Sequence, residues 1–288
     1  MPRVLIVGCG DIGCRVARLE RLGGAQQVIG VARSGVAATR LAAQGVELLQ
    51  CDLDVARSLI QLPTHNALIY YFAPPPAQGA TDSRIAAFLG AIHDDHQPQR
   101  IVLISTSGVY GNCHGAWIDE TAPTNPQSER AWRRLDGEIT LRSWSQQRAI
   151  SSVVLRVAGI YGPQRLPIAR IRQEVPVLRE AEAPFSNRIH ADDLARVCFA
   201  AAHKEVPAPI YNASDGNPTT MTDYFNRVAD LLGLPRPPAI TLLQAQQQLS
   251  PAMLSYLAES KRLDNRLMVH GLGVQPDYPD LASGLPAR

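Results

Sequence analysis

The chain is poor in lysine, in regularly spaced cysteine and in long apolar segments. Of its 28 basic residues only Lys204 and Lys261 are lysines, so arginine carries nearly all of the positive charge. The five cysteines are odd in number and lack a C-x-x-C spacing, which indicates reduced thiols in a cytoplasmic protein and no metal site. No apolar run approaches the roughly 20 residues of a membrane span. A strand pattern that begins at Val4 leaves no room for a signal peptide.

The bulk charge of the chain is also small. Its basic and acidic residues number 28 and 26 and give a formal net charge of +2, which provides no field that would recruit nucleic acid or a membrane surface. A hydrophobic content of 45% and a charged content of 19% are those of a globular protein. At 288 residues the chain can bury a full core, as one large domain or two smaller ones. We therefore expect a small-molecule partner.

The first strand pattern is followed directly by a glycine-rich turn. Residues 4–7 are apolar and mostly β-branched, as in a strand buried on both faces, and a helical pattern starts at Asp11. Strand, G-x-G-x-x-G and helix, in that order, suit a dinucleotide pyrophosphate, which the N–H groups of the helix start would face. A glycine turn in another kind of α/β protein is the alternative. The expected pyrophosphate site comprises Gly8, Gly10, Asp11, Ile12 and Gly13.

The residues after the second expected strand, 27–32, bear on the choice of cofactor. In NAD-binding units an acidic residue about 20 positions after the glycines bonds the ribose 2′-hydroxyl. That position holds Arg33, with Ser34 beside it, and a helix is expected over 35–44. Because a guanidinium binds a phosphate in bidentate geometry, we expect NADP to be preferred, with NAD as the second option. A solvent-facing arginine is the alternative.

Two further strands end in residues that can face the cofactor. The strand expected at 46–50 leads to Asp52 and Leu53, and Asp52 can accept a hydrogen bond from adenine or, alternatively, cap the following helix. The strand expected at 67–72 leads to Ala73 and Pro74, the first of three prolines. Prolines remove backbone donors and stiffen the turn, which suits a wall against a cofactor as well as an ordinary rigid loop.

Hydroxyl groups cluster after the fifth expected strand, 101–105. Ser105, Thr106 and Ser107 stand at its carboxyl end, where parallel sheets bind their ligands. From these residues onward the chain resembles the extended and atypical short-chain dehydrogenase/reductases, the NAD-dependent epimerase/dehydratase family. The resemblance extends over essentially the whole chain and includes four more stretches, Asp119–Pro123, Leu155–Pro163, Asn187–Ala195 and Tyr211–Ala213.

The resemblance implies a catalytic Ser or Thr, a Tyr and a Lys. Thr106 takes the Ser/Thr place and is expected to hydrogen-bond the reacting oxygen. On the helix expected at 128–147, the Tyr place falls on Arg130 and the Lys place on Arg134. None of the eight tyrosines has a lysine four residues later, so the Tyr-x-x-x-Lys pair is absent.

These replacements decide how the catalytic site is interpreted. Arg134 can still bond the nicotinamide ribose as a fixed positive charge. Arg130 stays protonated near pH 7, so it cannot exchange a proton, although it can bind an anionic substrate. The acid would then be Tyr110, Tyr161, His190 or a water. The extended family usually spaces its glycines as G-x-x-G-x-x-G, so the G-x-G-x-x-G turn of this chain also differs from the family pattern. Together these differences favour the atypical branch of the short-chain dehydrogenase/reductases.

The periodic pattern is lost after residue 163. By resemblance, the segment 164–185 joins a small C-terminal domain that closes over the cofactor. Three arginines of this segment and one beyond it can bind phosphate or carboxylate, or simply face solvent. They are Arg165, Arg170, Arg172 and Arg188. The expected substrate contacts are Ser107, Tyr161, Asn187 and Arg188, and Ser105 is expected beside the cofactor.

Alternating strand and helix patterns predict an α/β fold with a doubly wound, Rossmann-type parallel sheet. We expect a dinucleotide-binding domain at 1–165 plus about 186–216, and a smaller discontinuous substrate domain at about 166–185 plus 217–288. The resemblance implies an NADP-dependent epimerase, dehydratase or related oxidoreductase acting on a sugar nucleotide or another small polar carbonyl or alcohol. A non-catalytic NADP(H)-binding sensor or regulatory module is the alternative. The protein is expected to be a monomer or a homodimer, and the resemblance implies that a dimer forms through the helices at about 81–95 and 128–147.

Overall fold

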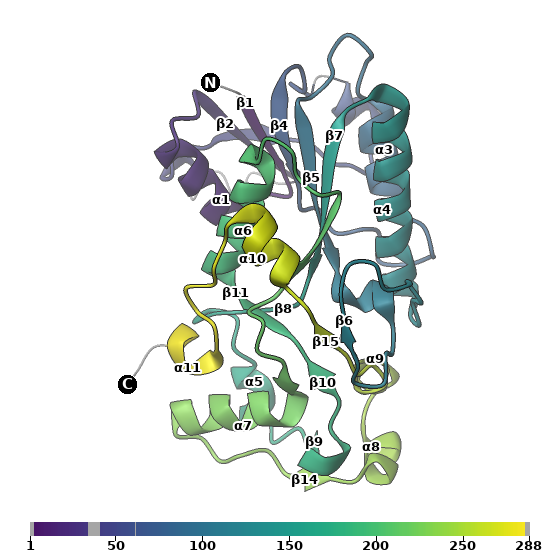
Figure 1. The fold of residues 1–288 in the computed structure, drawn as a ribbon, viewed down its shortest axis with the longest axis vertical. Helices are drawn as coiled ribbons and strands as arrows, with labels where there is room; N and C mark the ends of the chain where they lie inside the picture. Colours follow the sequence, from purple (N-terminus) through teal and green to yellow (C-terminus); the bar gives the residue numbers. More distant parts are fainter. Residues whose placement is uncertain (1–2, 34–40, 61, 286–288) are drawn as a thin grey trace.

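A parallel sheet forms the centre of the protein (Figure 1). The computed structural model describes residues 3–33, 41–60 and 62–285. Within them the sheet has seven strands in the order β12-β7-β5-β4-β1-β2-β3, and every neighbouring pair is parallel. Ser34 and most of the helix expected at 35–44 lie outside the described residues. The predicted doubly wound α/β fold is confirmed.

The sheet strands lie close to the ranges that the sequence predicts. They are β1 (Arg3–Val7), β2 (Gln27–Ala32), β3 (Glu47–Gln50), β4 (Ala67–Tyr71), β5 (Arg100–Thr106), β7 (Ser151–Val157) and β12 (Ile210–Ala213). The helices that cover them are α1 (Asp11–Leu22), α3 (Ser83–Gly90), α4 (Glu129–Arg148) and α6 (Ala191–His203). The helix expected at 81–95 is therefore shorter than predicted, beginning after the cap Asp82, whose side chain accepts from Ile85 N at 3.3 Å, and ending at Gly90.

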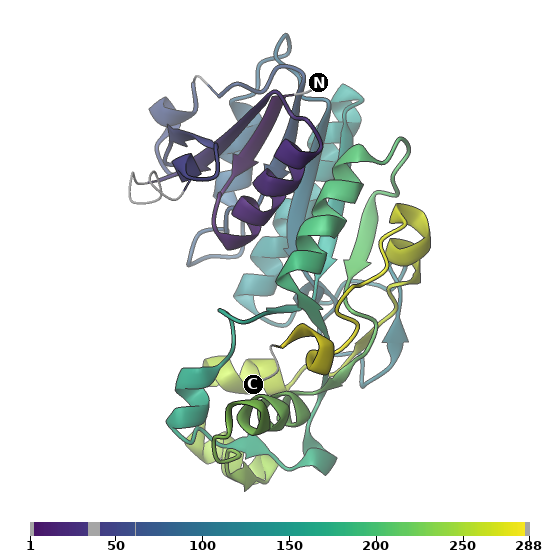
Figure 2. The same ribbon diagram turned by 90° about the vertical axis from the view of Figure 1, so that its left-hand side faces the viewer.

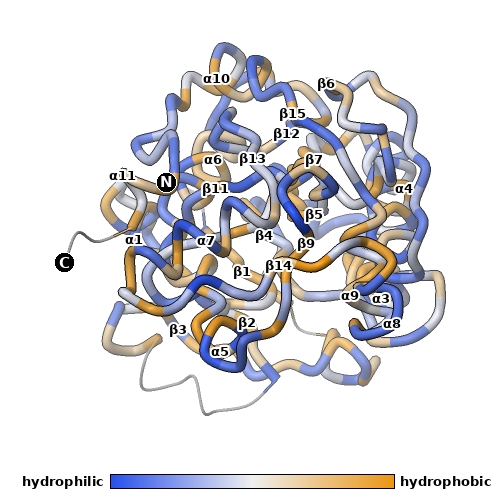
Figure 3. The backbone as a smooth tube through the Cα atoms, turned by 90° about the horizontal axis from the view of Figure 1, so that it is seen from below, coloured by the Kyte–Doolittle hydropathy of each residue, from blue (hydrophilic) through white to orange (hydrophobic). Residues whose placement is uncertain are grey.

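Alternate residues of β1 enter the cores on the two faces of the sheet, which is why residues 4–7 of this strand are all apolar. Val4 and Ile6 pack with α1 and α6, whereas Leu5 and Val7 pack with α3 and α4. All four side chains are fully buried. Figure 2 shows α1 and α6 side by side in front of the sheet. In Figure 3 the hydrophobic strand segments lie toward the middle of the molecule.

Short elements complete the chain, and many of them lie below the sheet in Figure 1. Tyr224 and Phe225 anchor a separate small core there. The strands are β6 (Trp117–Ile118), β8 (Gly159–Tyr161), β9 (Val177–Leu178), β10 (Phe185–Ser186), β11 (Arg188–His190), β13 (Thr219–Thr220), β14 (Ala239–Ile240) and β15 (Arg262–Leu263). The helices are α5 (Ile168–Arg172), α7 (Met221–Leu232), α8 (Leu242–Gln248), α9 (Pro251–Leu257), α10 (Arg266–Leu272) and α11 (Leu281–Gly284), with one-turn 3₁₀ helices η2 (Ala56–Leu59), η3 (Ser107–Tyr110) and η4 (Glu180–Glu182).

The end of the chain returns to the sheet. Met268 and Leu272 of α10 are buried in the same core as α6 and β12, so this helix accompanies the sheet although the expected boundary assigns it to the small domain. Just before it, β15 pairs in parallel with β6, which brings residues 256–262 to the carboxyl end of β5. Among the described residues no helix is long and apolar enough to cross a bilayer.

Candidate active site

The glycine turn after β1 has the geometry that close approach to the backbone requires. Gly8 has a φ of +87°, and a Cβ built on it would stand 2.6 Å from the backbone N of Ala73. A Cβ on Gly13 would meet Ile6 Cγ2 at 3.0 Å, so this glycine permits the close packing of α1 on β1. Above Gly10, in contrast, there is open space, with Gly8 O the nearest atom at 4.0 Å. The turn therefore presents bare backbone at the start of α1, which fits a diphosphate.

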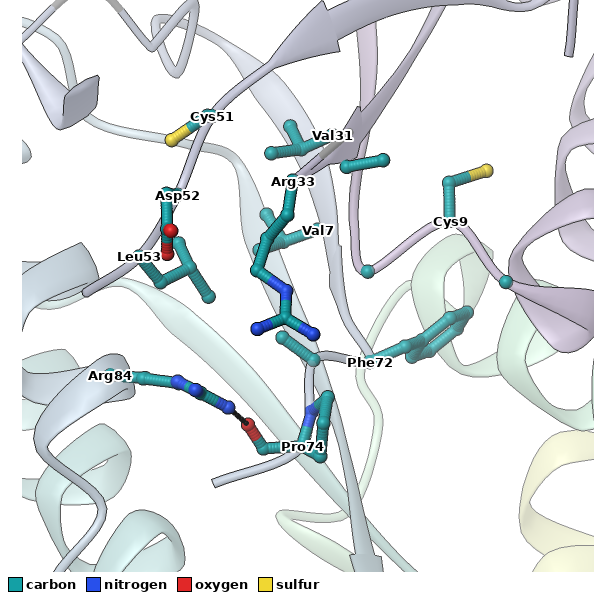
Figure 4. A pocket seen from close by; sticks show the side chains of 14 residues that line it. Val7, Cys9, Val31, Arg33, Cys51, Asp52, Leu53, Phe72, Pro74 and Arg84 are labelled. Carbon is teal, nitrogen blue, oxygen red and sulfur yellow. Dashed lines mark hydrogen bonds between the residues drawn. The ribbon is translucent and has the colours of Figure 1, made fainter. Parts of the chain in front are cut away.

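A cavity of about 410 Å³ opens beside this turn (Figure 4). Figure 4 shows the Arg33 side chain reaching into it from the end of β2, with Asp52 and Leu53 on one side and Phe72 on the other. The cavity brings together most of the residues expected at the cofactor: Gly8, Gly10, Arg33, Asp52, Leu53, Ala73 and Pro74.

Arg84 also lines this cavity and was not among the expected residues. Its Nη2 is 2.6 Å from Asp54 Oδ2, and its Nη1 donates to Pro74 O at 3.1 Å. The hydrogen bond from Arg84 holds the pKa of Asp54 below its ordinary value, and Arg33 acts in the same direction. The sequence could have indicated Arg84 through its position in the first turn of α3, the helix that follows the loop after β4.

Asp11 opens α1 but its carboxylate is occupied by two arginines. Arg165 Nε lies 2.7 Å from Asp11 Oδ2, and Arg15 Nε lies 3.0 Å from Oδ1. Burial alone would raise the pKa of Asp11, and the hydrogen bonds from Arg165 and Arg15 lower it below its ordinary value. Arg165 is thus paired with Asp11, and the Arg170 guanidinium lies 4.7 Å from the Phe225 ring centre. Neither arginine lines this cavity or the second one described below.

A second cavity, of about 570 Å³, meets the first at Pro74. Its walls come from the end of β5, the first turns of α4, the segment around β11 and the chain before β15. It unites six of the residues that the sequence assigns to catalysis or substrate binding: Thr106, Ser107, Arg130, Arg134, Asn187 and Arg188.

The three hydroxyls after β5 do not share one environment. Thr106 borders the second cavity, and its Oγ1 accepts a hydrogen bond from Gly108 N at 3.2 Å. Ser105, contrary to expectation, lines neither large cavity. Its hydroxyl is buried and donates to Glu138, because successive side chains of a strand point to opposite faces.

The two arginines at the Tyr and Lys places both face the second cavity from α4. The helix starts at the cap Ser128, whose hydroxyl accepts from Ala131 N at 3.4 Å. The Arg130 guanidinium lies over the ring of Tyr256, 3.5 Å from its centre. Arg134 Nη1 donates to Ile104 O at 3.2 Å, and burial lowers the pKa of Arg134. Both remain cations near pH 7.

The other acids that the sequence offers are engaged outside the two large cavities. Tyr110 donates to Asn212 Oδ1 at 2.7 Å, and Tyr161 donates to Asp280 O at 2.8 Å. Burial raises the pKa of both tyrosines. His190 caps α6 by accepting from Asp192 N, and burial lowers its pKa. Tyr161 is thus a packing residue here rather than a wall of the expected substrate site.

Asn187 and Arg188 connect β11 to the chain before β15. The Asn187 amide donates to Lys261 O at 3.0 Å and accepts from Leu263 N at 2.8 Å. Arg188 is 8% exposed and lies 4.3 Å from the Tyr224 ring centre.

Three residues of the same wall were not expected to line the site: Tyr256, Glu259 and Lys261. Lys261 Nζ is 2.7 Å from Glu259 Oε2 and donates to Gly111 O at 2.7 Å. The rarity of lysine in this chain is the signal that could have drawn attention to Lys261.

The parallel sheet with a glycine turn at the end of β1 defines the class as a Rossmann-type α/β protein. Residues 4–214 match the model of the NAD dependent epimerase/dehydratase family. The chain belongs to this family of enzymes.

Known proteins agree with this assignment. A stretch of 122 residues is 24% identical to human dTDP-D-glucose 4,6-dehydratase, covering 40% of this chain and 35% of the dehydratase, so the match spans about a third of that relative. A conserved protein of unknown function from Silicibacter pomeroyi has 29% identity and a TM-score of 0.84, over 99% of this chain and 96% of its own. The Thermus thermophilus UDP-glucose 4-epimerase in complex with NAD has 21% identity and a TM-score of 0.77, over 98% and 96%, and shows the fold alone.

Proposed function

We propose that this protein is an NADP-preferring enzyme of the epimerase/dehydratase or related oxidoreductase type. Its substrate would be a sugar nucleotide or another small polar carbonyl or alcohol compound. The observation that carries the proposal is the meeting of two cavities at Pro74, one beside the glycine turn and one beside Thr106. The dehydratase and the epimerase described above act on sugar nucleotides by their names, which supports this substrate class.

The first cavity is assigned to the adenosine half of the nucleotide. Gly8 and Gly10 leave the backbone accessible to a diphosphate, and the N–H groups at the start of α1 favour an anion. Arg33 supports NADP because its guanidinium is exposed at the cavity and lacks a carboxylate partner within 4.0 Å in the described part of the chain. Asp52, with Leu53, is placed for the adenine.

The second cavity is assigned to the reacting end. A nicotinamide bound there supplies or accepts a hydride. Thr106 then hydrogen-bonds the reacting oxygen, and Arg134 contributes a fixed positive charge to the nicotinamide ribose. Arg130 orients a substrate by charge, since a guanidinium does not exchange protons near pH 7. The substrate domain expected at about 166–185 plus 217–288 remains a prediction. So does a homodimer through α3 and α4.

One observation favours a second candidate function, a non-catalytic sensor of the NADP(H) ratio. The Tyr-x-x-x-Lys pair is absent, and Tyr110, Tyr161 and His190 make other hydrogen bonds. A sensor would bind NADP(H) and transfer no hydride to any compound.

The test begins with calorimetric titration of the purified protein with NADPH and NADH. We expect NADPH to bind at least about tenfold more tightly, the gain of a charge-assisted phosphate contact. Absence of heat with either nucleotide would overturn both functions. Conversion of any of a panel of sugar nucleotides by the protein with NADP⁺, or oxidation of NADPH by a small ketone, would favour the enzyme over the sensor. Each assay is run from about pH 6 to about pH 8.

A further inference from the structure

The charges that line the second cavity do not balance. Its basic side chains are Arg130, Arg133, Arg134, Arg188 and Lys261, and its acidic side chain is Glu259. Glu259 is taken by Lys261 at 2.7 Å, and Arg133 pairs at 3.6 Å with Glu129, which is not part of the wall. In the described ranges, three arginines of the wall therefore have no carboxylate within 4.0 Å: Arg130, Arg134 and Arg188.

Two of these cations are held away from water. Burial lowers the pKa of both Arg134 and Arg188. Their hydrogen-bond acceptors are neutral: Ile104 O for the first, and Asn187 O at 2.9 Å and the Met221 sulfur for the second. Asp82 acts on Arg134, and Asp215 on Arg188, from beyond the 4.0 Å of an ion pair. A bound anion in direct contact would supply the close counter-charge that a buried cation favours.

Aromatic rings fix the orientation of two of the guanidinium groups before any ligand arrives. Arg130 lies 3.5 Å from the ring centre of Tyr256, and Arg188 lies 4.3 Å from that of Tyr224. Stacking covers a face of a guanidinium plane and not its edges, and these edges match the oxygens of a carboxylate or phosphate. Arg130 and Arg134 are also four residues apart on α4, which puts two like charges on the same side of the helix.

We propose that the substrate carries an acid group, a carboxylate or a phosphate, close to its reacting carbon, and that Arg130 and Arg188 bind it. This specifies the substrate class and therefore rests on the proposed function. Thr106 borders the same cavity, so the acid group and the reacting oxygen are neighbours in the substrate. Position 130, where the family's tyrosine exchanges a proton, would then bind the charged group of the substrate in this chain.

The experiment is a calorimetric titration with oxalate and with inorganic phosphate, at constant ionic strength, of the protein saturated with NADPH and of the protein alone. The variants are Arg130→Gln, Arg188→Lys and, as matched control, Arg142→Gln, which removes an exposed arginine of α4 outside the cavity. We expect at least one anion to bind, Arg130→Gln to weaken it about tenfold or more, Arg188→Lys to weaken it less, and the control to leave it unchanged. Tighter binding of oxalate assigns a carboxylate, and tighter binding of phosphate assigns a phosphoryl group.

The outcomes separate this inference from the function on which it rests. Binding of NADPH without binding of either anion overturns the anion site and leaves the nucleotide function in place. If an anion binds and NADPH does not, the anion site stands and the nucleotide function is overturned. Equal weakening by Arg142→Gln and Arg130→Gln also overturns the site, because the anion would then report only the general charge of α4. Melting temperatures of the variants establish that each is folded, and Arg188→Lys keeps a positive charge at this buried position.

Discussion

Arg156 and Glu138 form an ion pair in the interior, with 2.8 Å between Nη2 and Oε2, and their exposed fractions are 4% and 1%. The Ser105 hydroxyl donates to the same carboxylate, and the Arg156 guanidinium lies 4.7 Å from the Tyr110 ring centre. This pair therefore holds the end of β5 from behind, where Thr106 faces the second cavity on the other side.

Replacement of Glu138 by alanine is expected to destabilise the protein strongly. It leaves Arg156 buried without its counter-charge, which costs about 3–5 kcal/mol of unfolding free energy. The measurement is equilibrium urea unfolding. The control is Arg227→Ala, which removes a half-exposed arginine paired with Asp223 at 2.8 Å on α7 and should cost less than about 1 kcal/mol. Equal losses in the two variants would contradict the assignment.

Two glycines of the same turn are expected to respond differently to alanine. Gly8→Ala combines a φ of +87° with a Cβ 2.6 Å from Ala73 N, so it should destabilise the fold by about 1–3 kcal/mol or more. Gly10→Ala places its methyl in open space and should leave the melting temperature nearly unchanged. It should nevertheless weaken NADPH binding, because the methyl occupies the approach to the backbone. Unimpaired NADPH binding by Gly10→Ala would argue against a diphosphate at this turn.

Replacement of Arg33 by alanine is expected to reduce the preference for NADP. The loss of the guanidinium should weaken NADPH binding about tenfold or more and leave NADH binding nearly unchanged. Fluorescence titration with both nucleotides measures the ratio. Arg57→Ala, which removes an exposed arginine of η2 outside the cavity, is the control. A ratio that stays constant in Arg33→Ala would show that Arg33 only faces solvent.

Thr106→Ala is expected to abolish turnover and to spare NADPH affinity, because the hydroxyl borders the second cavity and not the first. Thr106→Ser keeps both the hydroxyl and the hydrogen bond that Oγ1 accepts from Gly108 N, so it should retain activity. Once a substrate is found, steady-state kinetics compare the three proteins. Full activity in the alanine variant would rule out the proposed role.

Asp215 predicts a dependence of stability on pH. Burial raises its pKa to about 7, although Asn217 N donates to its carboxylate at 3.0 Å. The folded protein keeps this proton up to about pH 7 while the unfolded chain releases it near pH 4, so the unfolding free energy falls as pH rises through this window. Asp215→Asn removes the cost of ionising this buried carboxyl, so it should raise the melting temperature at pH 7.5 more than at pH 5. The exposed Asp95→Asn should show no such trend, and a parallel shift of both variants would contradict the prediction.

The sequence predicts the structure best where the same residues favour the local backbone conformation and also fit the packing of the whole fold. The apolar run at residues 4–7 and the three glycines after it predict a central strand and its turn, since few other arrangements use that pattern. The same holds for Gln27–Ala32, whose predicted range agrees with the structure. Arg130, Arg134 and Thr106 reach one cavity as expected, because the end of β5 and the first turns of α4 are neighbours in this fold.

Contacts between distant segments account for what the sequence does not reveal. Tyr256 and Lys261 reach the site only because β15 pairs with β6, a pairing of two residues on each side that leaves little periodic signal. Ser105 lies next to Thr106 in sequence, yet the partner that takes its hydroxyl is Glu138, 33 residues away. Tyr161 fits a family motif, but its ring meets α11, whose position no motif records.

The pair formed by Asp11 and Arg165 makes the electrostatic potential at the start of α1 depend on a remote connection. Arg165 lies between β8 and α5, on the path to the lower elements, and Arg15, the other partner of Asp11, is shared with Asp192. Because Arg165 neutralises a carboxylate in the first turn of α1, the segment that leads away from the sheet contributes to the positive potential that the start of this helix offers to an anion.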